Sequence, residues 1–200
     1  NGASRSSFDF GLDWMNKVAA VRLNHQANAK LFANVTLTRS EYAFNTGIQF
    51  SESEFNAGDS SAQSLTSLYQ SGIIDYAARL DFNYAYNNRH YIRYGANATL
   101  HTFNPGATTF QADFGEGFPA IDTTLGSPNV GSREFFAFIE DEIQLGTNLK
   151  ANIGLHAALL RVNGTAFPSL QPRAAVNYRL RDGSALKASY AQMNQFVHLL

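Results

Sequence analysis

The chain has 200 residues, with 15 Lys or Arg, 16 Asp or Glu and a formal net charge of −1. It has no cysteine, which excludes a disulfide framework and a cysteine zinc site, and its 13% aromatic content and balanced charge exclude a disordered tail. No basic cluster suggests nucleic-acid binding, and the longest apolar run has five residues, where a transmembrane helix needs about 20.

Residues 1–13 are rich in Ser, Gly and Asp and do not form a signal peptide, so we expect that one was removed or that the chain starts inside a longer one. From residue 17 onward, apolar and polar residues alternate with a period of two, which is typical of β-strands. The pattern predicts about eight strands paired as four hairpins, at 17–26, 30–46, 71–87, 89–103, 133–146, 149–163, 171–181 and 184–196.

The lengths of these strands and of their connections favour a membrane barrel. The strands exceed the usual five or six residues and match the about 9–11 that a tilted strand needs to cross a bilayer. Outer-membrane barrels have short periplasmic turns and long external loops. The short connections are predicted near 26–30, 87–89, 146–148 and 181–184, the long ones at 47–70 and 104–131, and a medium one at 163–169. We expect Pro105, Pro119, Pro128 and Pro168 in connections and Pro172 at the start of a strand.

The alternation also assigns side chains to two faces. The apolar set, expected to face lipid, includes Leu80, Ile92, Ala96, Ile153, Leu155 and Val176. The polar set could line a conduit or contact an internal plug, although barrel interiors are polar in general and their charges pair across strands. Its members are Arg22, Arg79, Asp81, Arg93, Asn97, Glu140, Glu142, Asn152, His156, Arg173 and Arg179.

Asp141 does not fit this pattern, because it shares the apolar face of its strand with Ala137, Ile139 and Ile143. A carboxylate that faces lipid is costly at mid-membrane and nearly free of cost at the interface. Either Asp141 lies near the headgroups or a bulge shifts the register there.

The two long connections carry six acidic residues and no Lys or Arg. These residues could attract cations or cationic ligands at the mouth of a barrel, or they could simply keep external loops solvated. They are Glu52, Glu54, Asp59, Asp113, Glu116 and Asp122.

Motifs of enzymes and cofactor sites are missing from the sequence. It contains no nucleophile elbow, no phosphate-binding loop, no dinucleotide fingerprint and no His-Glu-x-x-His spacing. His101 and His156 could share the inner face, but two isolated histidines predict a structural role. We therefore expect no catalytic residue, no metal site and no cofactor.

Several runs resemble the barrel of TonB-dependent outer-membrane receptors of the Bacteroidetes type. They are FIEDE at 138–142, KANIGL at 150–155, LQPR at 170–173 and the segment 186–200, with LDWMNK at 12–17, RLNH at 22–25, KLF at 30–32 and SGIID at 71–75. The resemblance covers the whole chain and follows the wall of the barrel, so it identifies no substrate.

The resemblance implies a middle segment of an antiparallel barrel of about 22 strands. The plug and the TonB box would lie outside these 200 residues. The implied function is import of a nutrient such as a siderophore, cobalamin, an oligosaccharide or a peptide across the outer membrane of a Gram-negative bacterium. The implied partners are outer-membrane lipids and lipopolysaccharide, the plug and remaining strands of the same protein, and the TonB complex.

Two other functions are compatible with the strand pattern. One is a self-contained eight-stranded structural or adhesive barrel, and the other is a passive pore, which needs about 16 or more strands. A segment of a larger barrel is expected to show two free edges or a strained closure. A small complete barrel is instead expected to pair 17–26 with 184–196 along most of their length.

Overall fold

The computed structural model of the protein describes residues 3–56, 59–115, 117–126 and 129–196. Within these ranges the chain forms nine strands and no helix, so no helix there could cross a membrane. The strands are β1 (Ala3–Gln26), β2 (Leu31–Asn56), β3 (Asp59–Ala85), β4 (His90–Asp113), β5 (Ile121–Gly126), β6 (Val130–Gln144), β7 (Leu149–Val162), β8 (Thr165–Arg179) and β9 (Ala185–Ala191).

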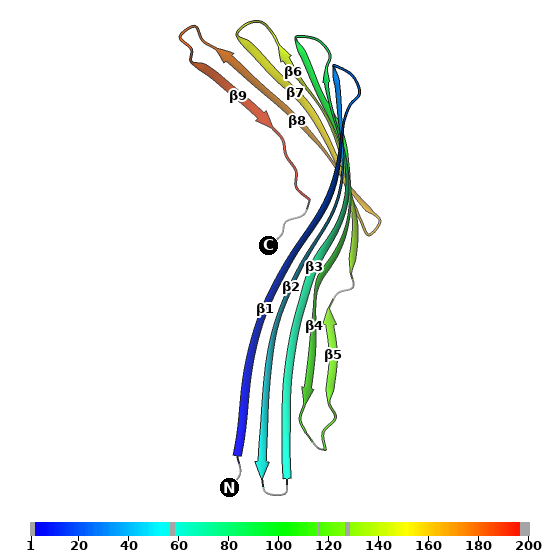
Figure 1. The fold of residues 1–200 in the computed structure, drawn as a ribbon, viewed down its shortest axis with the longest axis vertical. Helices are drawn as coiled ribbons and strands as arrows, with labels where there is room; N and C mark the ends of the chain where they lie inside the picture. Colours follow the sequence, from blue (N-terminus) through cyan, green and yellow to red (C-terminus); the bar gives the residue numbers. More distant parts are fainter. Residues whose placement is uncertain (1–2, 57–58, 116, 127–128, 197–200) are drawn as a thin grey trace. The chain divides into compact units, whose positions relative to one another are not determined.

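All nine strands belong to one sheet (Figure 1). Its order is β1-β2-β3-β4-β6-β7-β8-β9, and β5 pairs with β4 beside this path. Neighbours along the path follow one another in sequence except β4 and β6, which are separated in the chain by β5. The pairs β4–β5, β6–β7, β7–β8 and β8–β9 are antiparallel. The predicted all-β antiparallel fold is confirmed, with nine strands where about eight were predicted.

The prediction of long irregular connections at 47–70 and 104–131 is wrong. Strand β2 continues to Asn56, β3 starts at Asp59, β4 continues to Asp113, and β5 occupies 121–126. These segments are rich in Ser, Thr, Gln and Asn, so their hydrophobic alternation is weak. Backbone pairing with an adjacent strand does not require an apolar side chain at every second position, and the strands therefore extend beyond the hydrophobic pattern.

The medium connection predicted at 163–169 is also wrong. Strands β7 and β8 are joined by Asn163-Gly164 alone, with φ of +49° and +80°. Positive φ at both central residues is the conformation of the two-residue turn that suits strand twist, and Asn-Gly is its favoured sequence. Strand β8 therefore starts at Thr165, six residues before its predicted start.

Two prolines that were placed in connections lie inside strands instead, Pro105 in β4 and Pro168 in β8, and Pro172 lies within β8 rather than at its start. Strand β9 pairs with β8 only over Arg173–Arg179. Pro168 lies outside that range, so its missing N–H costs no hydrogen bond to β9, as at a sheet edge.

The described chain divides into two compact units. Unit 1 comprises 1–18, 40–74 and 102–130, and unit 2 comprises 19–39, 75–101 and 131–200. Unit 2 therefore contains β6 from Gly131, β7, β8, β9 and all four short turns, and β1–β4 contribute to both units.

In unit 2 the side chains separate onto two faces, most clearly along β7. Ile153 and Leu155 are 58% and 43% exposed, whereas Gly154 between them and His156 after them are buried. The pairing of β7 with β6 and β8 is regular along its length, so no bulge changes this order. We call the side with Leu80, Ala96, Ile153, Leu155 and Val176 the apolar face, and the side with Arg79, Arg93, Asn152, His156 and Arg173 the polar face.

The regular pairing also resolves the position of Asp141. It lies on the apolar face opposite Ile153, with no bulge in β6. His90, the first residue of β4, lies beside it, with Nδ1 2.6 Å from the carboxylate. Since β4 starts at a short turn, Asp141 lies near the end of the apolar band and has a partner there. Of the two possibilities considered for Asp141, this position fits the one near the headgroups and not the one with a bulge.

Three of the short turns are capped by an Asn or Asp side chain. Asn28 Oδ1 accepts hydrogen bonds from the N–H groups of residues 30 and 31, and Asn87 Oδ1 accepts from those of 89 and 90. Asp182 Oδ1 accepts from the Ser184 N–H at 2.9 Å, which holds the pKa of Asp182 below its ordinary value. Such caps fix the turn conformation locally.

Within the described residues the sheet does not close. Strand β1 pairs with β2 and β9 pairs with β8, and there is no pairing between 17–26 and 184–196. This open order corresponds to the two free edges expected for the larger barrel.

A polar cavity as the candidate functional site

The polar face of unit 2 forms a cavity of about 850 Å³. Seven of the eleven residues predicted for the inner face line it, namely Arg22, Arg79, Asp81, Arg93, Glu140, His156 and Arg173. Further lining residues that were not predicted for the inner face are Asn34, Thr36, Thr38, Asn83, Phe136 and Phe138. The alternation of apolar and polar residues could have predicted them, since each has the sequence spacing of the polar face of its strand.

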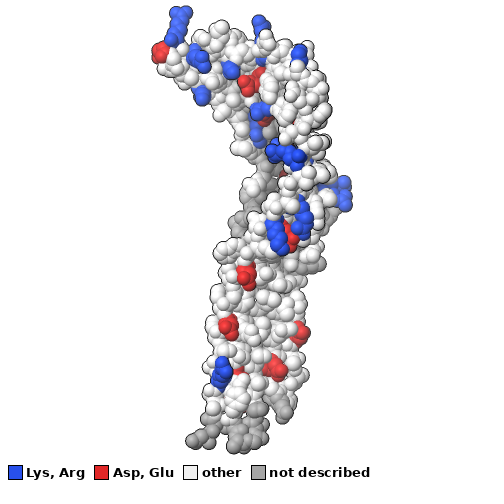
Figure 2. All heavy atoms as spheres, in the orientation of Figure 1, with Lys and Arg blue, Asp and Glu red and all other residues white. Residues whose placement is uncertain are grey.

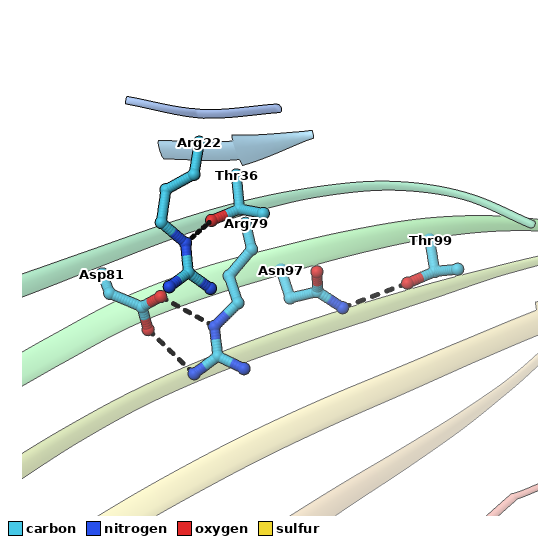
Figure 3. A network of polar contacts seen from close by, with 6 residues as sticks. All are labelled: Arg22, Thr36, Arg79, Asp81, Asn97 and Thr99. Atoms are coloured by element: carbon cyan, nitrogen blue, oxygen red, sulfur yellow. Dashed lines mark hydrogen bonds and ion pairs between the residues drawn. The ribbon is translucent and has the colours of Figure 1, made fainter. Parts of the chain in front are cut away.

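The part of the cavity formed by β1–β3 holds two hydrogen-bonded arginines (Figure 3). Arg22 Nε donates to Thr36 Oγ1 at 3.2 Å. Arg79 makes a two-pronged contact with Asp81, at 2.7 Å from Nε and 2.9 Å from Nη2. Because residues two apart on a strand share a face, Arg79 and Asp81 can pair within one strand. Figure 3 shows both arginines extending to the same side of the sheet.

The part formed by β4, β6 and β7 is centred on Glu140. One carboxylate oxygen lies 2.8 Å from Arg93 Nη2 and the other 2.7 Å from His156 Nε2. The side chains of Glu140 and His156 are 16% and 8% exposed. The His156 ring also contacts the rings of Phe136 and Phe138, at centroid distances of 5.2 and 5.3 Å. Glu140 therefore connects an arginine to a buried histidine held by two aromatic rings.

Two glycines make room for this cluster. A Cβ at Gly154, the residue opposite Glu140, would lie 2.8 Å from Glu140 Cγ. A Cβ at Gly95 would lie 2.4 Å from the Leu80 carbonyl oxygen and 2.7 Å from the Phe138 ring. Glycine inside a strand often marks such a close approach. The two glycines therefore determine where Glu140 and Phe138 can lie.

The cavity carries more positive than negative charge. Its lining includes four arginines and two carboxylates. Arg173 Nε and His156 Nδ1 are buried and have no hydrogen-bond partner among the described residues. Arginine donates to carboxylates, phosphates and carbonyl oxygens. The cavity is therefore suited to acceptor groups, from a ligand or from another protein segment.

The other predicted inner-face residues lie outside the cavity lining. Asn97 Nδ2 donates to Thr99 Oγ1 at 3.0 Å, and Glu142 lies 3.5 Å from Lys150 Nζ on the exposed part of the sheet. Asn152 lies opposite Glu142 in the register, and Arg179 lies opposite Ala185 at the end of β8.

The six acidic residues predicted in external loops lie mostly on strands. Glu52 and Glu54 are in β2, Asp113 ends β4, Asp122 is in β5 and Asp59 begins β3. Asp122 accepts from Gln111 at 3.3 Å, and Asp113 accepts from the Gly115 N–H at 3.0 Å. Glu116 and the side chain of Asp59 lie outside the described residues. No contact joins the other four into one cluster.

His101 and His156 have separate carboxylate partners. His101 Nδ1 lies 2.7 Å from Asp75, and its Nε2 lies 3.5 Å from Glu134. In the described ranges, no group of three or more candidate ligands is placed to hold a metal ion. The absence of a metal site stays a prediction.

Replacing Glu140 by alanine is expected to lower the free energy of unfolding by about 1–3 kcal/mol, because it leaves Arg93 and the buried His156 without their shared acceptor. Urea titration of the full-length receptor in detergent, followed by heat-modifiable gel migration, measures this loss. Glu140→Gln should lose less, because the amide oxygen still accepts. Glu142→Ala is the matched control, since exposed pairs contribute about 0–1 kcal/mol. Equal effects of E140A and E142A would contradict the assigned role of Glu140.

The open antiparallel sheet, apolar on one face of unit 2 and polar on the other, is the architecture of a barrel wall. The sequence model described as TonB-dependent receptor-like, beta-barrel, matches residues 1–194. The chain belongs to this family, whose members are outer-membrane receptors and transporters of Gram-negative bacteria. The Bacteroidetes type stays a prediction. None of the curated proteins compared with the chain matches it.

Three solved structures are among those similar to this chain. The FrpB iron transporter from Neisseria meningitidis is 12% identical with a TM-score of 0.48, and 90% of this chain aligns with 36% of it. The copper transporter OprC is 9% identical with a TM-score of 0.45, over 95% and 40% of the two chains. FpvA of P. aeruginosa with heterologous pyoverdines is 8% identical with a TM-score of 0.44, over 94% and 37%. The chain thus spans well under half the length of these proteins.

Proposed function

We propose that the chain forms wall and external strands of an active importer that carries a nutrient across the outer membrane. The candidates are a siderophore, cobalamin, an oligosaccharide or a peptide. The observation that carries the proposal is the polar cavity, set on the face opposite the apolar one in a chain of this family. A wall that is apolar toward lipid and polar toward its interior is what a transport barrel requires.

We further propose that a plug of the same protein contacts this cavity, and that the TonB complex acts through the plug region. The cavity has an excess of arginines, and Arg173 Nε has no hydrogen-bond partner in the described part of the chain, which favours carboxylate and carbonyl groups on the plug surface. Charge-assisted hydrogen bonds of this kind hold a segment in place and can be exchanged when it moves.

The charge of unit 1 supports a role in collecting ligand. Its sequence carries 2 Lys or Arg and 9 Asp or Glu, against 13 and 7 in unit 2. In Figure 2 the part that carries the N-terminus shows acidic side chains spread over a mostly uncharged surface. A surface of one charge sign raises the local concentration of oppositely charged ligands. We propose that Glu52, Glu54, Asp59, Asp113, Glu116 and Asp122 favour a ligand with cationic groups.

The test uses the full-length receptor in a strain that lacks its chromosomal copy. Uptake of labelled iron-siderophores, cobalamin, oligosaccharides and peptides is measured with and without TonB. One class should accumulate, and accumulation should stop without TonB. Entry of all small solutes regardless of TonB would indicate a passive pore, and entry of none would favour a structural barrel.

A charge variant then tests the acidic residues. Uptake by the variant with Glu52→Gln, Glu54→Gln and Asp122→Asn should fall at low ionic strength and approach the unmodified rate at high salt, because salt screens exposed charges. The control is Asp182→Asn, in a short turn of unit 2. An equal uptake change in the control would contradict the proposed role of unit 1.

A further inference from the structure

The apolar face of unit 2 carries two arginines side by side. Arg133 of β6 and Arg161 of β7 are direct cross-strand partners, and both are exposed. Two residues further along each strand on the same face, Phe135 lies opposite Leu159. Like charges placed opposite one another destabilise a strand pair. A group of opposite charge would remove this cost.

The protein supplies no such group among its described residues. Neither Arg133 nor Arg161 forms an ion pair or a side-chain hydrogen bond there. Both arginines line a cavity of about 440 Å³ together with Leu100 of β4. The two guanidinium groups are therefore available to a ligand, beside an apolar side chain.

A wide apolar groove of about 930 Å³ adjoins this pair. Its floor is formed by Ala78, Ala96, Ala98, Ala137 and Ala157, and Phe135 and Leu159 line it on the side of the arginines. The groove extends from β3 to β8, five strands that are neighbours in the sheet. At about 4.8 Å between strands this gives a width of roughly 20 Å, which is enough for several acyl chains side by side.

The position along the strands identifies the leaflet. The short turns at 27–30, 86–89, 145–148 and 180–184 lie at one end of the strands of unit 2. In outer-membrane barrels the short turns are periplasmic. Arg133 and Arg161 lie toward the opposite ends of β6 and β7. The Asn163-Gly164 turn at this end is short as well, but β2 and β4 continue here to Asn56 and Asp113, and all four of the other short turns lie at the far end. We therefore assign this end to the outer-leaflet side.

We propose that Arg133, Arg161 and the alanine-floored groove bind a phosphorylated, multiply acylated glycolipid of the outer leaflet, of the lipid A type. The two guanidinium groups hold its phosphate through paired N–H···O hydrogen bonds, a geometry that arginine provides and lysine does not. The acyl chains cover the groove. This inference rests on the outer-membrane location of the family and is independent of the nutrient that the receptor imports.

The test is native mass spectrometry of the full-length receptor in detergent, titrated with bisphosphorylated lipid A. Unmodified protein should retain the lipid, and the double variant Arg133→Gln, Arg161→Gln should bind it at least about tenfold more weakly, as expected for the loss of charge-assisted bonds. Arg181→Gln, in the turn at the other end, is the matched control and should bind normally. Heat-modifiable migration of each variant confirms that it is folded.

Two further arms identify the ligand. Dephosphorylated lipid A should bind the unmodified protein and the double variant equally weakly. Ala157→Trp, which fills the groove and leaves both arginines in place, should also weaken lipid A binding. Unchanged affinity in the folded double variant, or displacement of lipid A by equimolar phosphatidylglycerol, would overturn the proposal. Neither result depends on nutrient uptake, so failure here is distinct from failure of the proposed function.

Discussion

Replacing Leu155 by arginine is expected to destabilise the barrel folded in a bilayer by about 2–4 kcal/mol, the cost of a basic side chain that faces lipid near the midplane. Leu155 lies midway along β7, between Ile139 of β6 and Pro172 of β8, and its side chain is 43% exposed on the apolar face. Denaturant titration of the full-length receptor refolded into lipid vesicles measures the change.

The matched control is Asn152→Arg on the same strand. Asn152 belongs to the polar face, where an added charge meets polar neighbours and water, so its replacement should cost little. A tolerated arginine at 155 together with a costly one at 152 would mean that the register is displaced by one residue, because such a shift exchanges the faces of a strand.

Replacing Gly95 by valine is expected to destabilise the fold at the upper end of the about 1–3 kcal/mol typical of overpacking. The new Cβ would meet the Leu80 carbonyl oxygen, which belongs to the backbone and cannot rotate away, as well as the Phe138 ring. Displacing Phe138 would also disturb His156, whose ring it contacts. The measurement is the urea midpoint of the full-length receptor in detergent.

Gly11→Val provides the comparison, because a Cβ at Gly11 meets no atom within 4 Å. Valine also has the higher strand propensity, so this variant should be neutral or slightly stabilising. Equal losses of stability at the two positions would show that glycine acts in these strands through its backbone alone. The proposed role of Gly95, which is to leave space for Phe138, would then be wrong.

The membrane-spanning strands could be predicted from sequence because their alternation is strong. The extension of β1 back to Ala3 was missed for a different reason from the polar extensions of β2, β3 and β4. Its exposed apolar residues are odd-numbered at Val21 and Leu23 but even-numbered from Phe8 through Phe10 to Trp14. If only odd-numbered positions are checked for apolar residues, the pattern ends near residue 17 and the first part of β1 is missed. Checking even-numbered positions as well would have predicted that part of the strand.

The candidate site was predictable in its charges and not in its geometry. Arg93, Glu140 and His156 share a predicted face, yet their contact depends on the register between β4, β6 and β7, which one strand's pattern does not encode. The pairing of Arg133 with Arg161 likewise requires the β6–β7 register. Asp141 was recognised as anomalous, but its hydrogen-bond partner His90 lies 51 residues away in the sequence.

The capped short turns have a consequence for how the protein assembles. The caps of Asn28, Asn87 and Asp182 use only atoms within three residues of the capping side chain, so these turns can form before any strand is paired. We expect each turn to nucleate its hairpin, because closing the shortest loop first costs the least conformational entropy. The register of strands as long as 24 to 27 residues would then be set from their turn ends, through one local hydrogen bond after another.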